Sequence, residues 1–202
     1  MSETSFWDAR YSEPGFSYGT LPNDFLVAAT RHIPLGRVLC LAEGEGRNAV
    51  YLAELGYEVT AVDSSAVGIK KAAQLARTRN VSIITEVADL FEFAITPNYW
   101  DGIISIFAHL PPQLRAKVHR AAVEGLRPGG AFVLEAYTPR QLEFGTGGPQ
   151  SLDMLMTLET LRDELHGLDL VVAQEIERDF NEGRYHNGHG AVVQVVGIKV
   201  VA

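Results

Sequence analysis

This sequence of 202 residues contains one cysteine, no cluster of positive charge and no long apolar run. Its one cysteine, Cys40, excludes an intrachain disulfide and a cysteine-rich zinc site, and suits a reducing, cytoplasmic compartment. No basic run appears and the formal net charge is −8, which argues against binding nucleic acid. The longest apolar stretches are strand-sized, short of the roughly 20 residues that cross a bilayer. The N-terminal residues also lack the apolar core of a signal peptide.

The overall composition is that of an ordinary globular protein. Apolar residues make up 47% and charged residues 21% of the chain, and no repeat or low-complexity linker divides it. A chain of this length can bury one continuous core. We therefore expect residues 1–202 to form a single domain that acts on a small molecule, binds neither nucleic acid nor membrane, and exists as a monomer or homodimer.

Short apolar runs alternate with helical segments along most of the chain. Because these runs show no polar alternation, they predict strands that are covered on both faces of a parallel sheet. The last two strands lack an intervening helix, which predicts an antiparallel hairpin. The expected fold is α/β, a Rossmann-like three-layer sandwich with a mostly parallel seven-stranded sheet that ends in this hairpin. The predicted strands are 37–41, 58–63, 81–87, 100–107, 131–136, 168–179 and 190–201, with helices at 24–33, 48–55, 65–76, 112–123 and 157–166.

The turn after the first predicted strand contains the pattern Gly44-x-Gly46-x-x-Ala49. Glycines there allow the backbone to approach a ligand and to start a helix whose N–H groups face it. Asp63 ends the second strand, where its carboxylate can accept both hydroxyls of a ribose. Asp89 follows the third strand after Ala88, where it can accept from an adenine amino group. Together these features predict a nucleoside site.

The segment from Val38 to Ala49, VLCLAEGEGRNA, resembles motif I of class I methyltransferases that use S-adenosylmethionine (SAM). Asp63, Ala88-Asp89, the strand WDGIISI and the turn LRPGG fall where that superfamily has its later motifs, so the similarity spans about residues 36–136. The Gly-Arg-Asn-Ala run and the N-terminal pattern FWDARY resemble the tellurite-resistance (TehB-like) and thiopurine methyltransferase-like groups. The resemblance implies that SAM is the cofactor. It also implies cofactor contacts for Ala42, Glu43, Gly44, Gly46, Asn48, Asp63, Ser64, Ala88, Asp89, Leu90, Ile106 and Phe107.

Two residues depart from the family pattern. An acidic residue is usual where this chain has Cys40, and glycine is usual where it has Ala42. The acid helps to hold the ammonium group of SAM, so Glu43 is expected to replace it, or backbone carbonyls and Arg10-Tyr11 bind that end. Ala42 is expected to be tolerated if its φ is negative.

Methyl transfer is expected near the end of the fourth strand, because SAM carries its own electrophile and the protein mainly positions the acceptor. His109 lies there and is a candidate general base, or it caps the turn at Pro111. A thiolate or selenide acceptor would need no base. Residues 1–22 are expected to form a lid, since large aromatic side chains favour burial. Trp7, Tyr11 and Tyr18 supply this lid. Arg10, Tyr11 and Tyr18 are expected to contact the cofactor, and Trp7, Tyr137, Arg140 and His186 are candidates for contact with the acceptor.

Other interpretations remain open at this point. The segment RYHNGH (184–189) has histidines three apart but no fixed fourth ligand, so a polar turn is expected and no metal site. The glycine pattern with Asp63 also fits an NAD-dependent oxidoreductase. The departures at Cys40 and Ala42 suggest a SAM-binding protein without catalysis. The predicted function is nevertheless a SAM-dependent methyltransferase whose acceptor is a small molecule, such as a thiol, selenium or tellurium compound.

Overall fold

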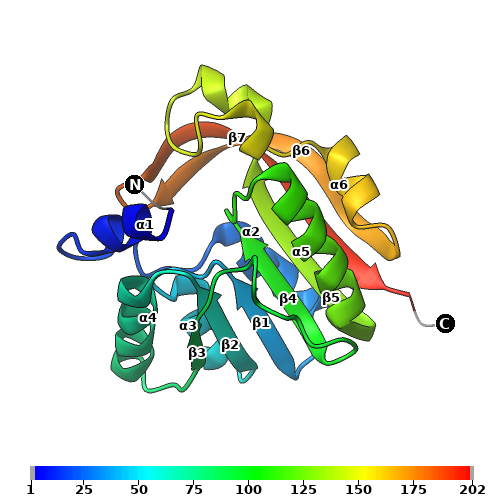
Figure 1. The fold of residues 1–202 in the computed structure, drawn as a ribbon, viewed down its shortest axis with the longest axis horizontal. Coiled ribbons are helices and arrows are strands. Elements are labelled where there is room, and N and C mark those ends of the chain that lie inside the picture. Colours follow the sequence, from blue (N-terminus) through cyan, green and yellow to red (C-terminus); the bar gives the residue numbers. More distant parts are fainter. Residues whose placement is uncertain (1–2, 201–202) are drawn as a thin grey trace.

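The computed structural model describes residues 3–200, and its fold is an α/β sandwich (Figure 1). Within these residues seven strands form one sheet in the order β3-β2-β1-β4-β5-β7-β6. The strands are β1 (Arg37–Leu41), β2 (Glu58–Asp63), β3 (Ile84–Val87), β4 (Trp100–Ile106), β5 (Leu126–Tyr137), β6 (Leu168–Glu182) and β7 (His186–Lys199). The α-helices are α1 (Glu3–Tyr11), α2 (Asp24–Ala29), α3 (Arg47–Glu54), α4 (Ala66–Thr78), α5 (Pro112–Gly125) and α6 (Leu158–Glu164), and short 3-10 helices cover Thr30–His32, Pro139–Glu143 and Leu152–Met154.

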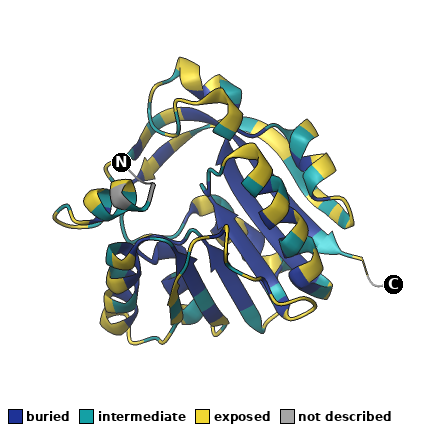
Figure 2. Cartoon of the chain, in the orientation of Figure 1, coloured by how far each residue is buried: buried dark blue, intermediate teal, exposed yellow. Residues whose placement is uncertain are grey.

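Strands β1 to β5 run parallel, whereas β7 is antiparallel to both β5 and β6. The predicted fold class is therefore confirmed. Apolar side chains from both faces of the sheet form two large buried clusters, one under α5 and α6 and one under α2 and α3. Figure 2 shows the central strands buried and the outward faces of the helices exposed. The lack of alternation in β1 thus has its expected cause, since four of its five residues are buried.

The chain reverses its winding direction between β1 and β4. Strands β2 and β3 lie on one side of β1, while β4, β5, β7 and β6 lie on the other. The segments that follow β1, β2, β3 and β4 therefore meet at one edge of the sheet, where ligands bind in open α/β folds. Helix α1 and the turn between β6 and β7 approach the same edge (Figure 1).

Several boundaries differ from the sequence-based prediction. No helix was predicted within the segment 1–22, yet α1 forms over Glu3–Tyr11. The terminal strands extend through most of the polar segment 181–190, because β6 continues to Glu182 and β7 begins at His186. Strand β5 starts directly after α5, with an irregularity in its pairing to β4 where Gly129 has a φ of +82°. The third strand is shorter than predicted. Residue 201 of the last predicted strand lies outside the described residues.

The helices of residues 3–200 include none that is long and apolar enough to cross a membrane.

Candidate functional site

The loop between β1 and α3 turns sharply by using left-handed backbone conformations. Ala42, Gly44 and Gly46 have φ values of +48°, +62° and +89°. A Cβ atom on Gly44 would lie 2.5 Å from the Tyr11 hydroxyl, and one on Gly46 would lie 2.5 Å from Cβ of Ala72. The negative φ under which Ala42 was expected to be tolerated is not what the structure has, because the chain reverses direction directly after β1. A non-glycine residue in this conformation costs about 1–2 kcal/mol.

Glu43 lies in this loop and caps the helix that follows it. Its Oε1 accepts hydrogen bonds from the backbone N–H groups of Asn48, at 3.0 Å, and Ala49, at 2.8 Å. The side chain is buried, and this burial raises its pKa to about 7 despite the opposing hydrogen bonds. Cys40 is fully buried in β1, whereas Glu43 lines a cavity. The carboxyl group of this region is therefore supplied by residue 43.

Asp63, at the end of β2, fixes the loop and faces the same cavity. Its Oδ2 accepts from Gly44 N and its Oδ1 from Ser65 N, both at 2.8 Å. Burial raises its pKa, although these two hydrogen bonds oppose the shift. Asp89 follows β3, is exposed and accepts from Phe91 N at 2.8 Å. Two carboxylates thus lie on the β2–β3 side of the cavity, separated along the edge of the sheet.

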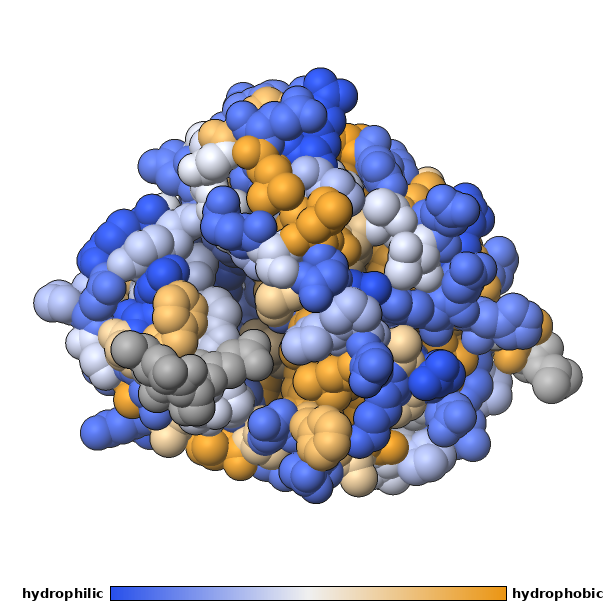
Figure 3. Space-filling model, turned by 45° about the horizontal axis from the view of Figure 1, so that its top comes forward, coloured by the Kyte–Doolittle hydropathy of each residue, from blue (hydrophilic) through white to orange (hydrophobic). Residues whose placement is uncertain are grey.

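The cavity has a volume of about 710 Å³, which is in the range of small-molecule sites. Figure 3 shows the molecular surface hollowed beside the N-terminal segment, with hydrophobic residues next to the hollow. The predicted residues that line the cavity are Trp7, Arg10, Tyr11, Tyr18, Ala42, Glu43, Asn48, Asp63, Ser64, Asp89, Leu90, Ile106, Phe107, His109 and His186. The space is large enough for a nucleoside that carries an amino-acid chain.

Five predicted residues do not line the cavity. Gly44 and Gly46 shape the loop behind it, and Ala88 donates its N–H to the backbone carbonyl of Asp63 at 3.0 Å. Tyr137 is fully buried, with its ring centroid 4.7 Å from that of Phe107. Arg140 is exposed and pairs with a carboxylate of β6 at 2.9 Å. The structure therefore places neither Tyr137 nor Arg140 at the cavity wall.

The N-terminal segment covers the cavity with stacked aromatic rings. The Trp7 ring stacks on Tyr11 at a centroid distance of 5.5 Å, and Tyr18 lies 6.4 Å from both rings. Asp8 accepts from the Ser65 hydroxyl at 2.5 Å, which ties α1 to the start of α4. The Arg10 guanidinium lies 3.7 Å from the centroid of the Tyr185 ring. These contacts place the aromatic residues of the predicted lid over the cavity.

The turn between β6 and β7 holds the N-terminal segment from the other side. Arg184 and Tyr185 both contact the carboxylate of Glu13, with the Tyr185 hydroxyl 2.7 Å from Oε1. Arg184 N also donates to Ser17 O at 2.9 Å. Sequence reasoning assigned no role to Glu13 or Tyr185, because nothing in the local pattern connects residues that are about 170 positions apart. The polar composition of the segment 181–190 was the only available signal.

His109 occupies a position in which both ring nitrogens have partners. Its Nδ1 lies 3.0 Å from the carbonyl oxygen of Met154, and its Nε2 lies 3.4 Å from the backbone N–H of Tyr137. Burial lowers its pKa to about 4, so the ring is neutral at pH 7. An Nδ1–H tautomer satisfies both contacts. This arrangement supports a structural role next to the cavity and gives no support to proton transfer.

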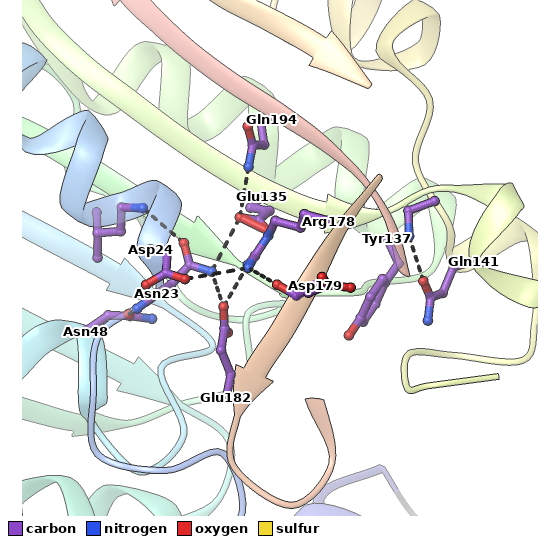
Figure 4. Close-up of polar contacts among 12 residues, drawn as sticks. Asn23, Asp24, Asn48, Glu135, Tyr137, Gln141, Arg178, Asp179, Glu182 and Gln194 are labelled. Atoms are coloured by element: carbon purple, nitrogen blue, oxygen red, sulfur yellow. Dashed lines mark hydrogen bonds and ion pairs between the residues drawn. The ribbon is translucent and has the colours of Figure 1, made fainter. Parts of the chain in front are cut away.

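A buried polar cluster joins the start of α2 to β5 and β6 (Figure 4). Glu135 is fully buried and pairs with Arg178 at 2.7 Å, while Arg178 pairs with Glu182 at 2.6 Å. Asn23 donates its Nδ2 to both carboxylates and its backbone N–H to Oδ1 of Asn48. Asn48 is therefore held by the protein's own backbone at the edge of the cavity.

Arg47 is a cavity residue that sequence reasoning missed. It follows Gly46, is 7% exposed, and donates Nη2 to Glu182 at 2.7 Å. The Gly-Arg-Asn-Ala run that contains it indicated a family resemblance but no role for this residue. Among residues 3–200, no group of three or more His, Cys, Asp or Glu side chains is arranged to hold a metal ion.

Part of the chain is similar to known methyltransferases. Residues 38–130 match a family described as a methyltransferase domain. The 2-heptyl-1-hydroxyquinolin-4(1H)-one methyltransferase of Mycobacteroides abscessus is 26% identical over 141 residues, which are 68% of this chain and 62% of that protein. The chain thus spans less than two thirds of this relative.

Solved structures share the fold at low sequence identity. A structure described as "Conversion of a Disulfide Bond into a Thioacetal Group during Echinomycin Biosynthesis" has a TM-score of 0.80 and 21% identity, covering 98% of this chain and 92% of that chain. TehB from Haemophilus influenzae has a TM-score of 0.73 and 19% identity, covering 97% of this chain and 66% of that chain. The chain is therefore similar to methyltransferases over residues 38–130, and the solved structures share its fold.

Proposed function

We propose that the chain transfers the methyl group of SAM to a small-molecule acceptor in the cavity beneath α1. The observation that carries this proposal is the buried carboxylate of Asp63 at the end of β2, facing a cavity of about 710 Å³ beside the glycine loop. SAM supplies an electrophilic methyl group on a sulfonium, so the protein needs neither a covalent residue nor a metal. Its task is to bind and orient.

The residues on the β2–β3 side fit the nucleoside half of SAM. Both Asp63 oxygens accept backbone hydrogen bonds and retain lone pairs that ribose hydroxyls can use. Asp89 and Leu90 offer a carboxylate and an apolar side chain to the adenine. Glu43, at the start of α3, is placed to receive the ammonium group. This assignment requires its ionised form, which the positive charge of the ligand favours.

The opposite part of the cavity fits an acceptor with an apolar portion. Trp7 from the lid, Phe107 after β4, Leu114 of α5 and Met154 line it. The relatives support a small molecule, since one is named for a hydroxyquinolinone and the echinomycin structure for a disulfide. We propose a thiol, selenium or tellurium compound as the first class to test. We also propose that the chain is one domain that works in the cytoplasm as a monomer or homodimer.

Titration calorimetry separates this function from that of an NAD-dependent oxidoreductase. We expect saturable binding of SAM and of S-adenosylhomocysteine, and none of NAD. Binding of NAD alone would overturn the proposal. A protein that binds SAM without catalysis is excluded by methylated product formed from labelled SAM with a panel of thiols, selenite and tellurite. A panel without any product would favour that second candidate, which the unusual Cys40 and Ala42 first suggested.

Replacement of Asp63 tests where the ribose lies. Asp63→Ala is expected to weaken binding of S-adenosylhomocysteine by about 1.5–3 kcal/mol, which is the cost of a lost hydrogen bond to a charged group. Asp63→Asn is a milder variant, since its amide oxygen can still accept one of the two backbone N–H groups. Asp101→Asn is a matched control, because Asp101 also accepts a backbone N–H, from Arg37 at 2.8 Å, but does not line the cavity. Unchanged affinity in Asp63→Ala would show that the ribose binds elsewhere.

A further inference from the structure

Two buried nitrogen atoms beside the cavity lack a hydrogen-bond partner. They are Nη1 of Arg47 and Nδ1 of His186, and each residue is 7% exposed. Leaving a buried polar group unsatisfied costs about 1–3 kcal/mol, and more when the group is charged. Both residues line the cavity. A ligand with hydrogen-bond acceptor atoms at these positions would remove this cost.

Contacts with the β6–β7 end of the sheet and with Phe107 hold these two residues. His186 begins β7, and its ring lies 4.4 Å from that of Phe107, which follows β4. Arg47 extends from α3 to Glu182 at the end of β6. Asp63 and Asp89 instead follow β2 and β3, at the opposite end of the strand order. His186 thus lies beside Phe107 and Arg47 beside Glu182, so a ligand that reaches the β6–β7 side of the cavity meets both donors.

The charges of this wall favour an anion. Arg47 can only donate, and Glu182 uses one of its two terminal nitrogens. Arg10 adds a second guanidinium to the same cavity. The pKa of His186 lies well below its usual value, first because of burial and then because of Arg47, His109, Arg178 and Arg10. The neutral imidazole ring can donate a hydrogen bond from Nδ1, but it is a poor base at pH 7.

The remaining titratable groups do not change this conclusion. His109 is also neutral, and its nitrogens are engaged with Met154 and Tyr137. Glu182 is held by Arg47, Arg178 and Asn23. Glu43 lies in the loop after β1, where its Oε1 caps α3. None of these three groups is therefore a free base beside His186.

We infer that Arg47 and His186 bind the methyl acceptor as an anion, so that the acceptor is a compound with an acidic O–H or S–H group. This inference rests on the proposed function and names its substrate class. The acceptor loses its proton to solvent on binding. Its lone pair then forms the new C–O or C–S bond while the bond from the methyl carbon to sulfur breaks, and the electron pair of that bond stays on sulfur. No oxidant, metal or protein base takes part.

Chromophoric acids test this inference without relying on turnover. The ionised forms of 4-nitrophenol and 4-nitrobenzenethiol absorb visible light, so their pKa can be measured when bound to the protein with S-adenosylhomocysteine present. We expect the anion to bind about tenfold or more tightly than the neutral form, seen as a lowered pKa of the bound probe. The phenol and the thiol distinguish an oxyanion from a thiolate site. An unchanged pKa for both probes, or no binding of either, would overturn the inference.

His186→Phe is the decisive variant. Its ring fits between Tyr18 and Phe107, and the lost Nδ1 has no partner in the protein, so we expect folding to be retained. The preference for the anion should fall about tenfold, while affinity for S-adenosylhomocysteine stays unchanged. Arg47→Gln, which can still donate to Glu182, should have the same effect. The control is His166→Phe, because His166 is exposed and lies outside the cavity.

The outcomes separate this inference from the proposed function. If S-adenosylhomocysteine does not bind the unchanged protein, the proposed function fails. If it binds normally but His186→Phe and Arg47→Gln retain the anion preference, only the inference fails. If both variants instead lose affinity for S-adenosylhomocysteine, the two donors hold the carboxylate of the cofactor and the inference is overturned.

Discussion

At the scale of single residues, the loop after β1 combines two unusual choices. Ala42 adopts a left-handed conformation that favours glycine, and a carboxyl group is supplied by Glu43 while Cys40 is buried in the strand. The geometry of the loop accommodates both departures from the family pattern. Glu43 gains two backbone hydrogen bonds at the start of α3, which fix its carboxyl group at the cavity. The cost of this arrangement is backbone strain and a buried acid.

Ala42→Gly should stabilise the protein. It removes the strain of a φ of +48°, about 1–2 kcal/mol, and restores about 0.4–1 kcal/mol of chain entropy to the unfolded state. The expected net gain is between zero and about 1.6 kcal/mol in the free energy of unfolding, measured by urea denaturation. Asn80→Gly, at a φ of +57° remote from the cavity, is a control with a smaller gain, because asparagine tolerates this conformation. A loss of stability in Ala42→Gly would contradict the strain.

At the scale of elements, α1 and the turn between β6 and β7 hold each other in place over the cavity. Their contacts include the Glu13 carboxylate with Arg184 and Tyr185, and the Arg10 guanidinium on the Tyr185 ring. The backbones approach closely where Gly183 meets Tyr18 and Gly19, since a Cβ atom on Gly183 would collide with both. This close approach requires glycine at residue 183.

Gly183→Ala should release the N-terminal segment. The added methyl group would displace Tyr18 and Gly19, so we expect faster trypsin cleavage after Arg10 and weaker binding of S-adenosylhomocysteine. Gly129→Ala is the matched control. It also has a positive φ, +82°, but a Cβ atom there meets nothing within 4 Å. Equal cleavage rates in the two variants would attribute the effect to backbone strain alone and refute the role of the close contact.

At the scale of the whole molecule, buried acids and buried histidines oppose each other in their dependence on pH. The pKa of Glu43 is raised to about 7, so its contribution to stability is lost as the pH rises from about 4.5 to about 7. The pKa of His109 is lowered to about 4, so its contribution is lost as the pH falls from about 6.5 to about 4. The two trends partly cancel between about pH 4.5 and about pH 6.5.

Glu43→Gln should reveal the pH dependence of stability that His109 contributes. The amide oxygen of the glutamine can still accept from Asn48 N and Ala49 N, but the variant lacks the carboxyl group with the raised pKa. The free energy of unfolding should therefore rise more steeply with pH between about pH 4.5 and about pH 6.5. The slope is expected to change by up to about 1.4 kcal/mol per pH unit. Urea denaturation across this pH range measures it. Parallel curves for Glu43→Gln and the unchanged protein would show that Glu43 is already ionised at the lower pH.

The sheet and its hairpin ending were predicted from the sequence alone and are confirmed, while the cofactor half of the site stays a prediction. Short apolar runs that alternate with capped helices specify parallel strands, and the glycine loop with Asp63 and Asp89 at strand ends predicts a nucleoside site. These features are local: each depends on hydrophobic periodicity or backbone conformation within a few residues. The helix α1 was missed because its aromatic and polar residues show no clear apolar stripe.

The surroundings of the proposed acceptor follow from packing between segments that are distant in the sequence. His109 lies near the end of β4 as expected, yet both of its nitrogens are engaged, whereas His186 and Arg47 have buried nitrogens without partners. Arg140 lies outside the cavity wall and pairs with Glu177. Whether a polar group is satisfied depends on residues more than 100 positions away, such as Glu182 for Arg47. No pattern along the chain records such a contact, because it arises from packing between β6, β7 and α3.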